Sequence, residues 1–129
     1  MNIIDSSAWL EYFSDGPNAD SFSVPIQDEN ALIVPVITVY EVFKVVLRES
    51  TENNALQAVA AMQKGRMADL THDLAIEASR LSLQYSLPMA DSIILATAKK
   101  YDCTIWTQDI DFKDIEGVNY FVKKMAASG

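Results

Sequence analysis

Short continuous apolar runs alternate along the chain with longer stretches in which apolar residues recur three and four positions apart. A short run is typical of a strand buried on both faces, and the longer pattern is typical of an amphipathic helix. The runs predict strands at 1–4, 32–35, 67–70, 103–106 and 119–122. The longer pattern predicts helices at 8–13, 37–49, 52–64, 72–84 and 88–100. A further short helix at 18–27 is expected to be interrupted at Pro25, because proline removes a backbone donor.

This alternation predicts the α/β class, with a mostly parallel central sheet of about four to five strands and helices on both faces. We expect a single domain over residues 1–124 and a frayed tail over 125–129. In such a sheet the carboxyl ends of the strands share one edge, and ligands bind beyond that edge. Side chains that directly follow a predicted strand are therefore the first candidates for function.

The composition limits the class of protein. Half of the 129 residues are hydrophobic and only 4 are glycine, which is typical of a packed globular domain. The net charge of −8 argues against a polyanionic partner, unless several acids bind divalent cations at one site. The longest apolar stretch, 31–37, is far shorter than the roughly 20 residues of a membrane span, and we find no signal peptide pattern. With a single cysteine, Cys103, the chain fits a reducing compartment, and we expect a cytoplasmic protein without a membrane partner.

The first predicted strand is followed at once by Asp5, Ser6 and Ser7. An acid or a hydroxyl at this position is typical of the N-cap of the next helix, because its side chain accepts a bond from a free backbone N–H. The same position also lies at the edge of the sheet where ligands bind. The residues by themselves leave both roles open for Asp5.

Asp91 falls near the start of the helix that begins at Pro88. An acid at this end is favoured by the helix dipole, which explains its presence without any function. Its spacing from Leu95 and Ala98, however, puts the carboxylate along an apolar side of the helix. Burying an unpaired carboxylate is costly, so Asp91 is expected to have hydrogen bonds, a cation or a metal as a partner.

Further acids follow the strand before the last, where Thr107, Asp109 and Asp111 come directly after it. Parallel strands end at the same edge, so these acids are expected to meet Asp5 and Asp91 there. Carboxylates this close raise one another's pKa values, and a bound Mg²⁺ or Mn²⁺ removes the conflict. All-oxygen ligation in a chain with a single histidine favours such a hard cation over zinc.

The helix predicted at 37–49 carries a charged stripe of Glu41, Lys44 and Arg48. Ion pairing on a solvated face explains this spacing and is worth only about 0.3 kcal/mol per pair. Apolar residues cover most of the remaining surface of the helix. We therefore expect it to be covered on more than one side, including by a second copy of the protein.

Segments of distinctive sequence occur in order along the chain, namely IIDSS at 3–7, TVYEV at 38–42, ADSIILATA at 90–98 and TQDIDF at 107–112. Together they resemble PIN-domain ribonucleases, particularly the VapC-type toxins of bacterial and archaeal toxin–antitoxin pairs. The resemblance covers nearly the whole chain. It implies a PIN-like form of the predicted α/β sheet.

The resemblance also implies roles for the acids. It implies a catalytic quartet of Asp5, Glu41, Asp91 and Asp109, with Asp111 as an accessory acid. It implies that Asp5, Asp91, Asp109 and Asp111 ligate the metal, and we place Asp109 closer than Asp111 because it comes sooner after the strand. The resemblance changes the interpretation of Glu41 from a surface ion-pair residue, which its spacing alone suggests, to a residue of the site.

Hydroxyl and basic residues complete the implied site. Ser6 and Thr107 match the hydroxyl positions that orient the acids, and Lys44 and Arg48 are candidates for contacts with substrate phosphates. The implied activity is hydrolysis of RNA phosphodiester bonds with Mg²⁺ or Mn²⁺ as cofactor. The implied partners are an RNA substrate, an antitoxin that covers the acids, and a second copy in a homodimer.

An alternative is a non-catalytic acidic binding module, either a degenerate PIN domain or a receiver-like domain of similar length and architecture. Receivers carry an acid pair after the first strand and a phosphoacceptor after the third, whereas here one acid follows the first strand and Thr71 follows the third. A haloacid-dehalogenase-type phosphatase needs a second aspartate two residues after the first, and that residue is Ser7. The receiver-like and phosphatase alternatives therefore fit less of the sequence, whereas a degenerate PIN domain used only for protein binding stays open, although all four acids are present.

Overall fold

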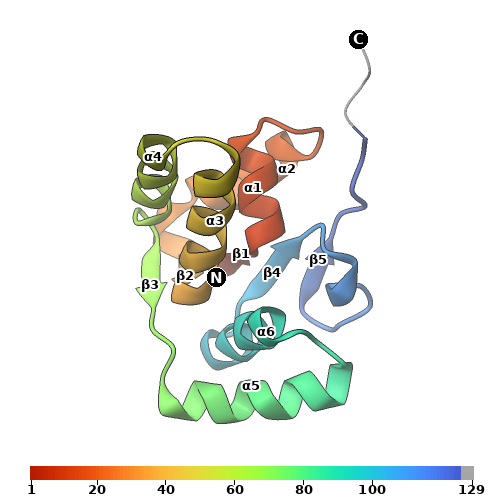
Figure 1. Ribbon diagram of the computed structural model, residues 1–129. Helices are drawn as coiled ribbons and strands as arrows, with labels where there is room; N and C mark the ends of the chain where they lie inside the picture. Colours follow the sequence, from red (N-terminus) through yellow and green to blue (C-terminus); the bar gives the residue numbers. More distant parts are fainter. Residues whose placement is uncertain (126–129) are drawn as a thin grey trace.

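The structure, a computed structural model, describes residues 1–125 (Figure 1). Of the expected C-terminal tail it includes only Met125, and 126–129 lie outside the described residues. The strands form a 5-stranded parallel sheet in the order β3-β2-β1-β4-β5. The strand bounds are β1 Asn2–Ile4, β2 Leu32–Pro35, β3 Arg66–Ala68, β4 Thr104–Thr107 and β5 Val118–Tyr120. The predicted α/β class with a parallel sheet is confirmed.

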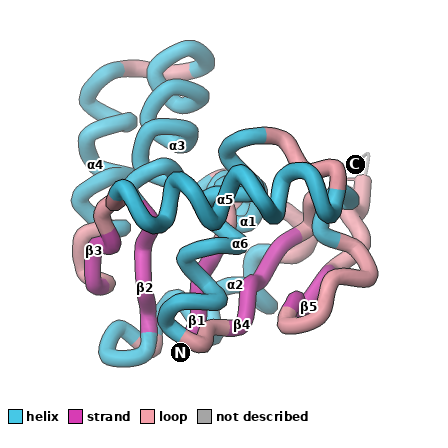
Figure 2. Tube along the Cα trace, turned by 90° about the horizontal axis from the view of Figure 1, so that it is seen from below, coloured by secondary structure: helices cyan, strands magenta, loops and turns pink. Residues whose placement is uncertain are grey.

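Helices cover both faces of this sheet (Figures 1 and 2). They are α1 Ser6–Phe13, α2 Ala19–Gln27, α3 Val36–Glu49, α4 Glu52–Met62, α5 His72–Tyr85 and α6 Met89–Tyr101, with short 3₁₀ turns η1 Glu29–Ala31 and η2 Ile110–Phe112. Side chains of successive strand residues point to opposite faces, so Ile3 packs in the cluster under α5 and α6, and Ile4 packs in the cluster under α1 to α4. None of the helices within the described residues is long and apolar enough to cross a bilayer.

The central strand β1 places two distant parts of the sequence side by side. In the register of the sheet, Ile3 lies opposite Ile33 of β2 on one side and Ile105 of β4 on the other. The carboxyl ends of β1 and β4 are therefore adjacent, and the backbone N–H of Asp5 donates to the carbonyl of Trp106 at 3.1 Å. Because receiver-type sheets have the order 2-1-3-4-5, the observed order excludes the receiver-like alternative.

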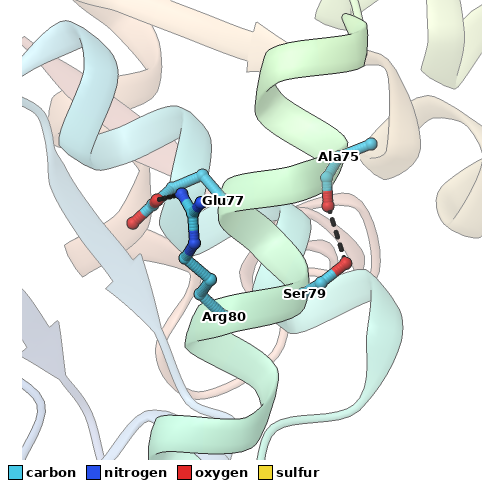
Figure 3. A network of polar contacts seen from close by, with 4 residues as sticks. All are labelled: Ala75, Glu77, Ser79 and Arg80. Carbon is cyan, nitrogen blue, oxygen red and sulfur yellow. Dashed lines mark hydrogen bonds and ion pairs between the residues drawn. The ribbon is translucent and has the colours of Figure 1, made fainter.

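The outer face of α5 has the pattern of a solvated helix surface (Figure 3). Arg80 pairs with Glu77 at 3.4 Å, and the Ser79 hydroxyl donates to the Ala75 carbonyl at 2.9 Å. At the start of this helix the Thr71 hydroxyl accepts from the Leu74 N–H at 3.2 Å, which confirms the predicted N-cap. Such exposed ion pairs contribute little stability, so α5 is held in place by its buried face.

The prediction that Pro25 interrupts a helix is wrong, because α2 continues through it to Gln27. Proline removes only the bond to the carbonyl four residues earlier, and Ser21 at that position is exposed to water. The proline ring itself is buried, which helps to offset the lost bond. The other predicted bounds differ from the observed ones by at most two residues. Pro88, expected at the first helical position, is instead the N-cap of α6.

Candidate functional site

Asp5 occupies the carboxyl end of β1 and is almost completely buried. One carboxylate oxygen, Oδ1, accepts from the backbone N–H of Ala8 at 2.9 Å and from the Ser7 hydroxyl at 2.8 Å. The other, Oδ2, accepts from the Thr107 hydroxyl at 2.6 Å. Asp5 therefore caps α1 and at the same time joins the end of β1 to the end of β4.

The end of β4 continues this arrangement toward two further acids. The Thr107 hydroxyl, which is fully buried, also accepts from the backbone N–H of Asp109 at 2.9 Å. The Asp109 carboxylate in turn accepts from the N–H of Asp111 at 2.9 Å and caps η2. These short local bonds hold Asp109 and Asp111 immediately beyond the sheet.

Asp91 enters from α6 and completes a group of three carboxylates. One ligand oxygen from each of Asp91, Asp109 and Asp111 lies within 4.8 Å of the others. Asp91 is 8% exposed, so most of its surface is removed from water and its charge is only partly screened from the neighbouring acids. The structure thus brings together three of the four predicted metal ligands. The fourth, Asp5, lies outside this group and is held by the hydrogen bonds from Ala8, Ser7 and Thr107.

The pKa values of two acids rise at this site. Burial, followed by the charges of Asp109, Asp5 and Glu41, raises the pKa of Asp91 to about 8. Burial also raises the pKa of Asp5 to about 6, although its three hydrogen bonds act in the opposite direction. Since the charges of Asp109, Asp5 and Glu41 all act on Asp91, the predicted acidic quartet converges on this side chain.

Glu41 in α3 is partly buried, and its carboxylate accepts from the Ser6 hydroxyl at 2.6 Å. The surface ion pairs that its spacing suggested are not observed within residues 1–125. Instead, Lys44 lies over the Tyr40 ring, 5.6 Å from its centroid, and Arg48 pairs with Glu49 at 3.1 Å. No contact joins Lys44 or Arg48 to the acids in the described structure.

Three polar residues at this edge of the sheet were missed by the sequence analysis as site residues. The Ser7 hydroxyl donates to Asp5 and accepts from the backbone N–H of Gln108 at 3.3 Å. The Gln108 side chain accepts from the Asn18 carboxamide at 3.0 Å. A hydroxyl two residues after Asp5 was a usable signal for Ser7, but no local pattern connects Asn18 with Gln108.

The oxygen atoms of the three-acid group fit a hard divalent cation. Oxygens bound to the same Mg²⁺ at about 2.1 Å lie roughly 3 to 4 Å apart, so Asp91, Asp109 and Asp111 need only small rotations to share one ion. No lysine or arginine of the described residues forms an ion pair with these acids. An all-carboxylate donor set without a neutralising side chain is suited to Mg²⁺ or Mn²⁺.

Replacing Thr107 with valine is expected to disturb this site while preserving its shape. The substitution leaves the N–H of Asp109 and one oxygen of Asp5 without their buried partner, which costs roughly 2–3 kcal/mol in the free energy of unfolding. It also raises the pKa of Asp5 further, because the Thr107 hydrogen bond lowers that pKa. Urea unfolding measures the first effect, and carboxyl-carbon NMR titration measures the second.

Thr107→Ser is the matched control, because it keeps the hydroxyl and removes only a methyl group. It is expected to retain the pKa of Asp5. An unchanged Asp5 pKa in Thr107→Val would contradict the role of this hydroxyl in holding the carboxylate.

Comparison with known proteins finds a matching family and similar structures that cover most of the chain. The PIN domain family model matches residues 3–118. A toxin–antitoxin complex from Klebsiella pneumoniae has a similar chain, with a TM-score of 0.77 and 23% identity, covering 92% of this chain and 96% of that one. Mycobacterium tuberculosis VapC20, a sarcin–ricin-loop-cleaving toxin, is similar with a TM-score of 0.76 and 14% identity, over 90% of this chain and 95% of that one. VapBC2 from Rickettsia felis, bound to a DNA fragment from its promoter, is similar with a TM-score of 0.73 and 14% identity, over 93% of this chain and 96% of that one.

Comparison with curated protein sequences gave no significant match. The family model nevertheless spans most of the chain, from β1 into β5. The similar structures share this fold over at least 90% of the chain. The chain therefore belongs to the PIN domain family.

Proposed function

We propose that the protein is a ribonuclease that hydrolyses RNA phosphodiester bonds with Mg²⁺ or Mn²⁺ and acts as the toxin of a toxin–antitoxin pair. The observation that carries the proposal is the convergence of unneutralised acids on Asp91 at the carboxyl edge of the sheet. A structural role does not explain it, because these charges repel and raise the pKa of Asp91. Membership of the PIN domain family supports a nuclease activity.

The acids divide into two groups by their surroundings. Asp91, Asp109 and Asp111 would hold the cation, since their oxygens already lie together. A divalent cation at such a site supplies a water of lowered pKa as nucleophile and stabilises charge on the phosphoryl oxygens. Asp5 would be a further ligand or orient water, and Thr107 keeps its carboxylate in one position. Glu41, held by Ser6, would accept a proton or position water near Asp91.

Basic residues on α3 would contact the RNA backbone beyond the acids. Lys44 and Arg48 follow Glu41 by one and two helical turns and are both exposed. Their charges have only weak, solvent-exposed partners, the Tyr40 ring and Glu49. They are therefore free to exchange these partners for phosphates.

An antitoxin is the proposed protein partner. The acids attract a lysine- or arginine-bearing segment, which would neutralise them as a cation does. Structures of similar chains in toxin–antitoxin complexes support this part of the proposal. We further propose that a second copy covers the outward face of α3, where Tyr40 is 60% and Leu47 is 44% exposed, and that the protein acts in the cytoplasm.

The test is cleavage of a panel of structured and single-stranded RNAs by the purified protein, in Mg²⁺, in Mn²⁺ and in EDTA. We expect cleavage with either metal and none in EDTA, and we expect Asp5→Asn to lose most of the activity. Asp20→Asn is the control, because Asp20 is an exposed acid of α2 that takes no part in the three-acid group or in the hydrogen bonds of Asp5. Sedimentation of the same preparation reports whether the protein is a dimer.

Cleavage that survives EDTA or the Asp5 substitution would contradict the metal-dependent mechanism. If no RNA is cleaved and calorimetry detects no metal binding, the remaining alternative of a non-catalytic acidic protein-binding module is favoured instead.

A further inference from the structure

Asn18 stands at the N-cap of α2 without capping it. An asparagine at this position ordinarily accepts a bond from a backbone N–H of the first helical turn, but the Asn18 side chain makes no such bond. Its amide nitrogen donates instead to the Gln108 side-chain oxygen and to the Val122 carbonyl, each at 3.0 Å. Asn18 is 2% exposed, so both donors are committed to partners about a hundred residues away in the sequence.

The loop that carries Asn18 is itself held by a buried carboxylate. The Glu11 side chain, 9% exposed, accepts from the backbone N–H of Asn18 at 2.9 Å. Gly16 lets the loop fold closely over this carboxylate, because a Cβ at that position would overlap Glu11 Oε1 and Cδ. The backbone of Asn18 is therefore anchored before its side chain reaches across to β4.

Gln108 connects Asn18 to the acids through hydrogen bonds. This residue lies between Thr107 and Asp109, and its side chain is also buried, with 7% exposed. Its backbone N–H donates to the Ser7 hydroxyl, which donates in turn to Asp5. Any movement of Gln108 would therefore shift the turn that carries Asp109 and the hydroxyl that holds Asp5.

We propose that Asn18 is a positioning residue for the acidic site. Its carboxamide holds Gln108, and through Gln108 it keeps the exit of β4 in the geometry that brings Asp109 to Asp91. Loss of this carboxamide should weaken divalent-cation binding and loosen the turn at Asp109, beyond any general loss of stability. The part of the proposal that concerns cation binding rests on the function proposed above.

The competing explanation is that Asn18 only fastens the C-terminal segment through the Val122 carbonyl. The two explanations differ in the effect that they predict when the Asn18 and Gln108 side chains are removed together. If Asn18 acts through Gln108, removing both side chains should be little worse than removing one. If Asn18 acts only through Val122, the two effects should be independent.

The experiment measures Mn²⁺ affinity by calorimetry for the wild type, Asn18→Ala, Gln108→Ala and the double variant. We expect each single variant to bind about tenfold more weakly, as is typical of residues that support ligands, and the double variant to bind no more weakly than either single one. Ser23→Ala removes an exposed hydrogen bond within α2 and should bind like the wild type. Wild-type affinity in Asn18→Ala, or effects that multiply in the double variant, would overturn the proposal.

Amide hydrogen exchange of the metal-free proteins provides a readout that needs no cation. The N–H of Asp109 should exchange at least about tenfold faster in Asn18→Ala and Gln108→Ala, while the N–H of Ala78, a buried residue in the middle of α5, reports global opening and should be unchanged. Equal acceleration at both amides means that Asn18 has only a general structural role. If the wild type binds no Mn²⁺, the proposed function fails, and the exchange rates still decide whether Asn18 holds the β4 exit.

Discussion

Replacing Asp91 with asparagine is expected to abolish RNA cleavage and, in the same variant, to stabilise the metal-free protein. Activity should fall by roughly a hundredfold or more, because charge stabilisation by a bound cation is worth several kcal/mol. Stability should rise because burial and the charges of Asp109, Asp5 and Glu41 make the folded wild type keep Asp91 protonated at neutral pH, a cost that the uncharged asparagine does not have. A group whose role is structural would show the opposite sign of stability change.

The gain in stability is limited by solvent. Asp91 is not completely enclosed, so water screens part of the repulsion and we expect on the order of 1 kcal/mol at neutral pH, or about 4 °C in melting temperature. Thermal unfolding in EDTA measures this shift, and cleavage assays in Mg²⁺ measure the activity. Asp102→Asn is the matched control at the other end of α6, where the exposed residue has a φ of 54° that asparagine also tolerates.

The two effects of Asp91→Asn must occur together. Lower stability without metal would indicate that the carboxylate has a stabilising partner, and retained cleavage would exclude Asp91 from the proposed mechanism. Asp102→Asn should leave cleavage unchanged and raise stability by only about 0.3 kcal/mol, because it removes an unfavourable charge at a helix C-terminus.

The metal-free protein is also expected to lose stability as the pH rises from about 4 to about 8, and divalent cations should reverse the loss. The pKa of Asp5 is about 6 in the folded state, against an ordinary value of 3.8. Between these values the folded state keeps a proton that the unfolded state has released, so stability falls as the pH rises. For Asp5 the loss is on the order of 3 kcal/mol by pH 7.

Asp91 extends the same trend to higher pH. Its contribution is fully present below its ordinary pKa of 3.8 and is lost as the pH rises through about 8. A cation that binds the ionised acids replaces the protons, and at a hundred times its dissociation constant it stabilises the protein by about 2.7 kcal/mol. The stabilising effect of Mg²⁺ or Mn²⁺ should therefore increase with pH.

Melting temperatures recorded from pH 5 to pH 8.5, with EDTA or with Mg²⁺, measure this dependence. Other carboxylates titrate over the lower part of this range, so the difference between wild type and Asp91→Asn isolates the contribution of that acid. A cation-induced shift that is equal at pH 5 and pH 8, or that persists undiminished in Asp91→Asn, would contradict the prediction.

The main elements of the fold follow from local patterns in the sequence. The apolar run at 32–35 predicted β2, and the spacing of apolar residues predicted α3, α5 and α6 to within a few residues. Neighbouring side chains in a strand point to opposite faces, so a continuous apolar run is enough to indicate a strand that is covered on both faces. The same local reasoning failed at Pro25, where burial of the ring and solvation of a free carbonyl keep the helix intact.

The acids were found in part from the sequence. Asp5, Asp91 and Asp109 could be proposed because each follows a strand or begins a helix. Glu41 could not be separated from a surface ion-pair residue by its spacing, and only the family resemblance suggested a role. Its contact with Ser6, 35 residues earlier, depends on how α3 packs against α1.

Hydrophobic periodicity and capping act over a few residues, so local patterns are enough to locate the strands and helices and the acids that follow a strand or begin a helix. The hydrogen bonds from Thr107 to Asp5 and from Asn18 to Gln108, and the effect of three other acids on Asp91, arise from the packing of elements far apart in the sequence. These contacts depend on β1 pairing between β2 and β4 in one register. Register is set by packing across the whole sheet, so no local pattern in the sequence predicts which distant side chains it brings within hydrogen-bonding distance.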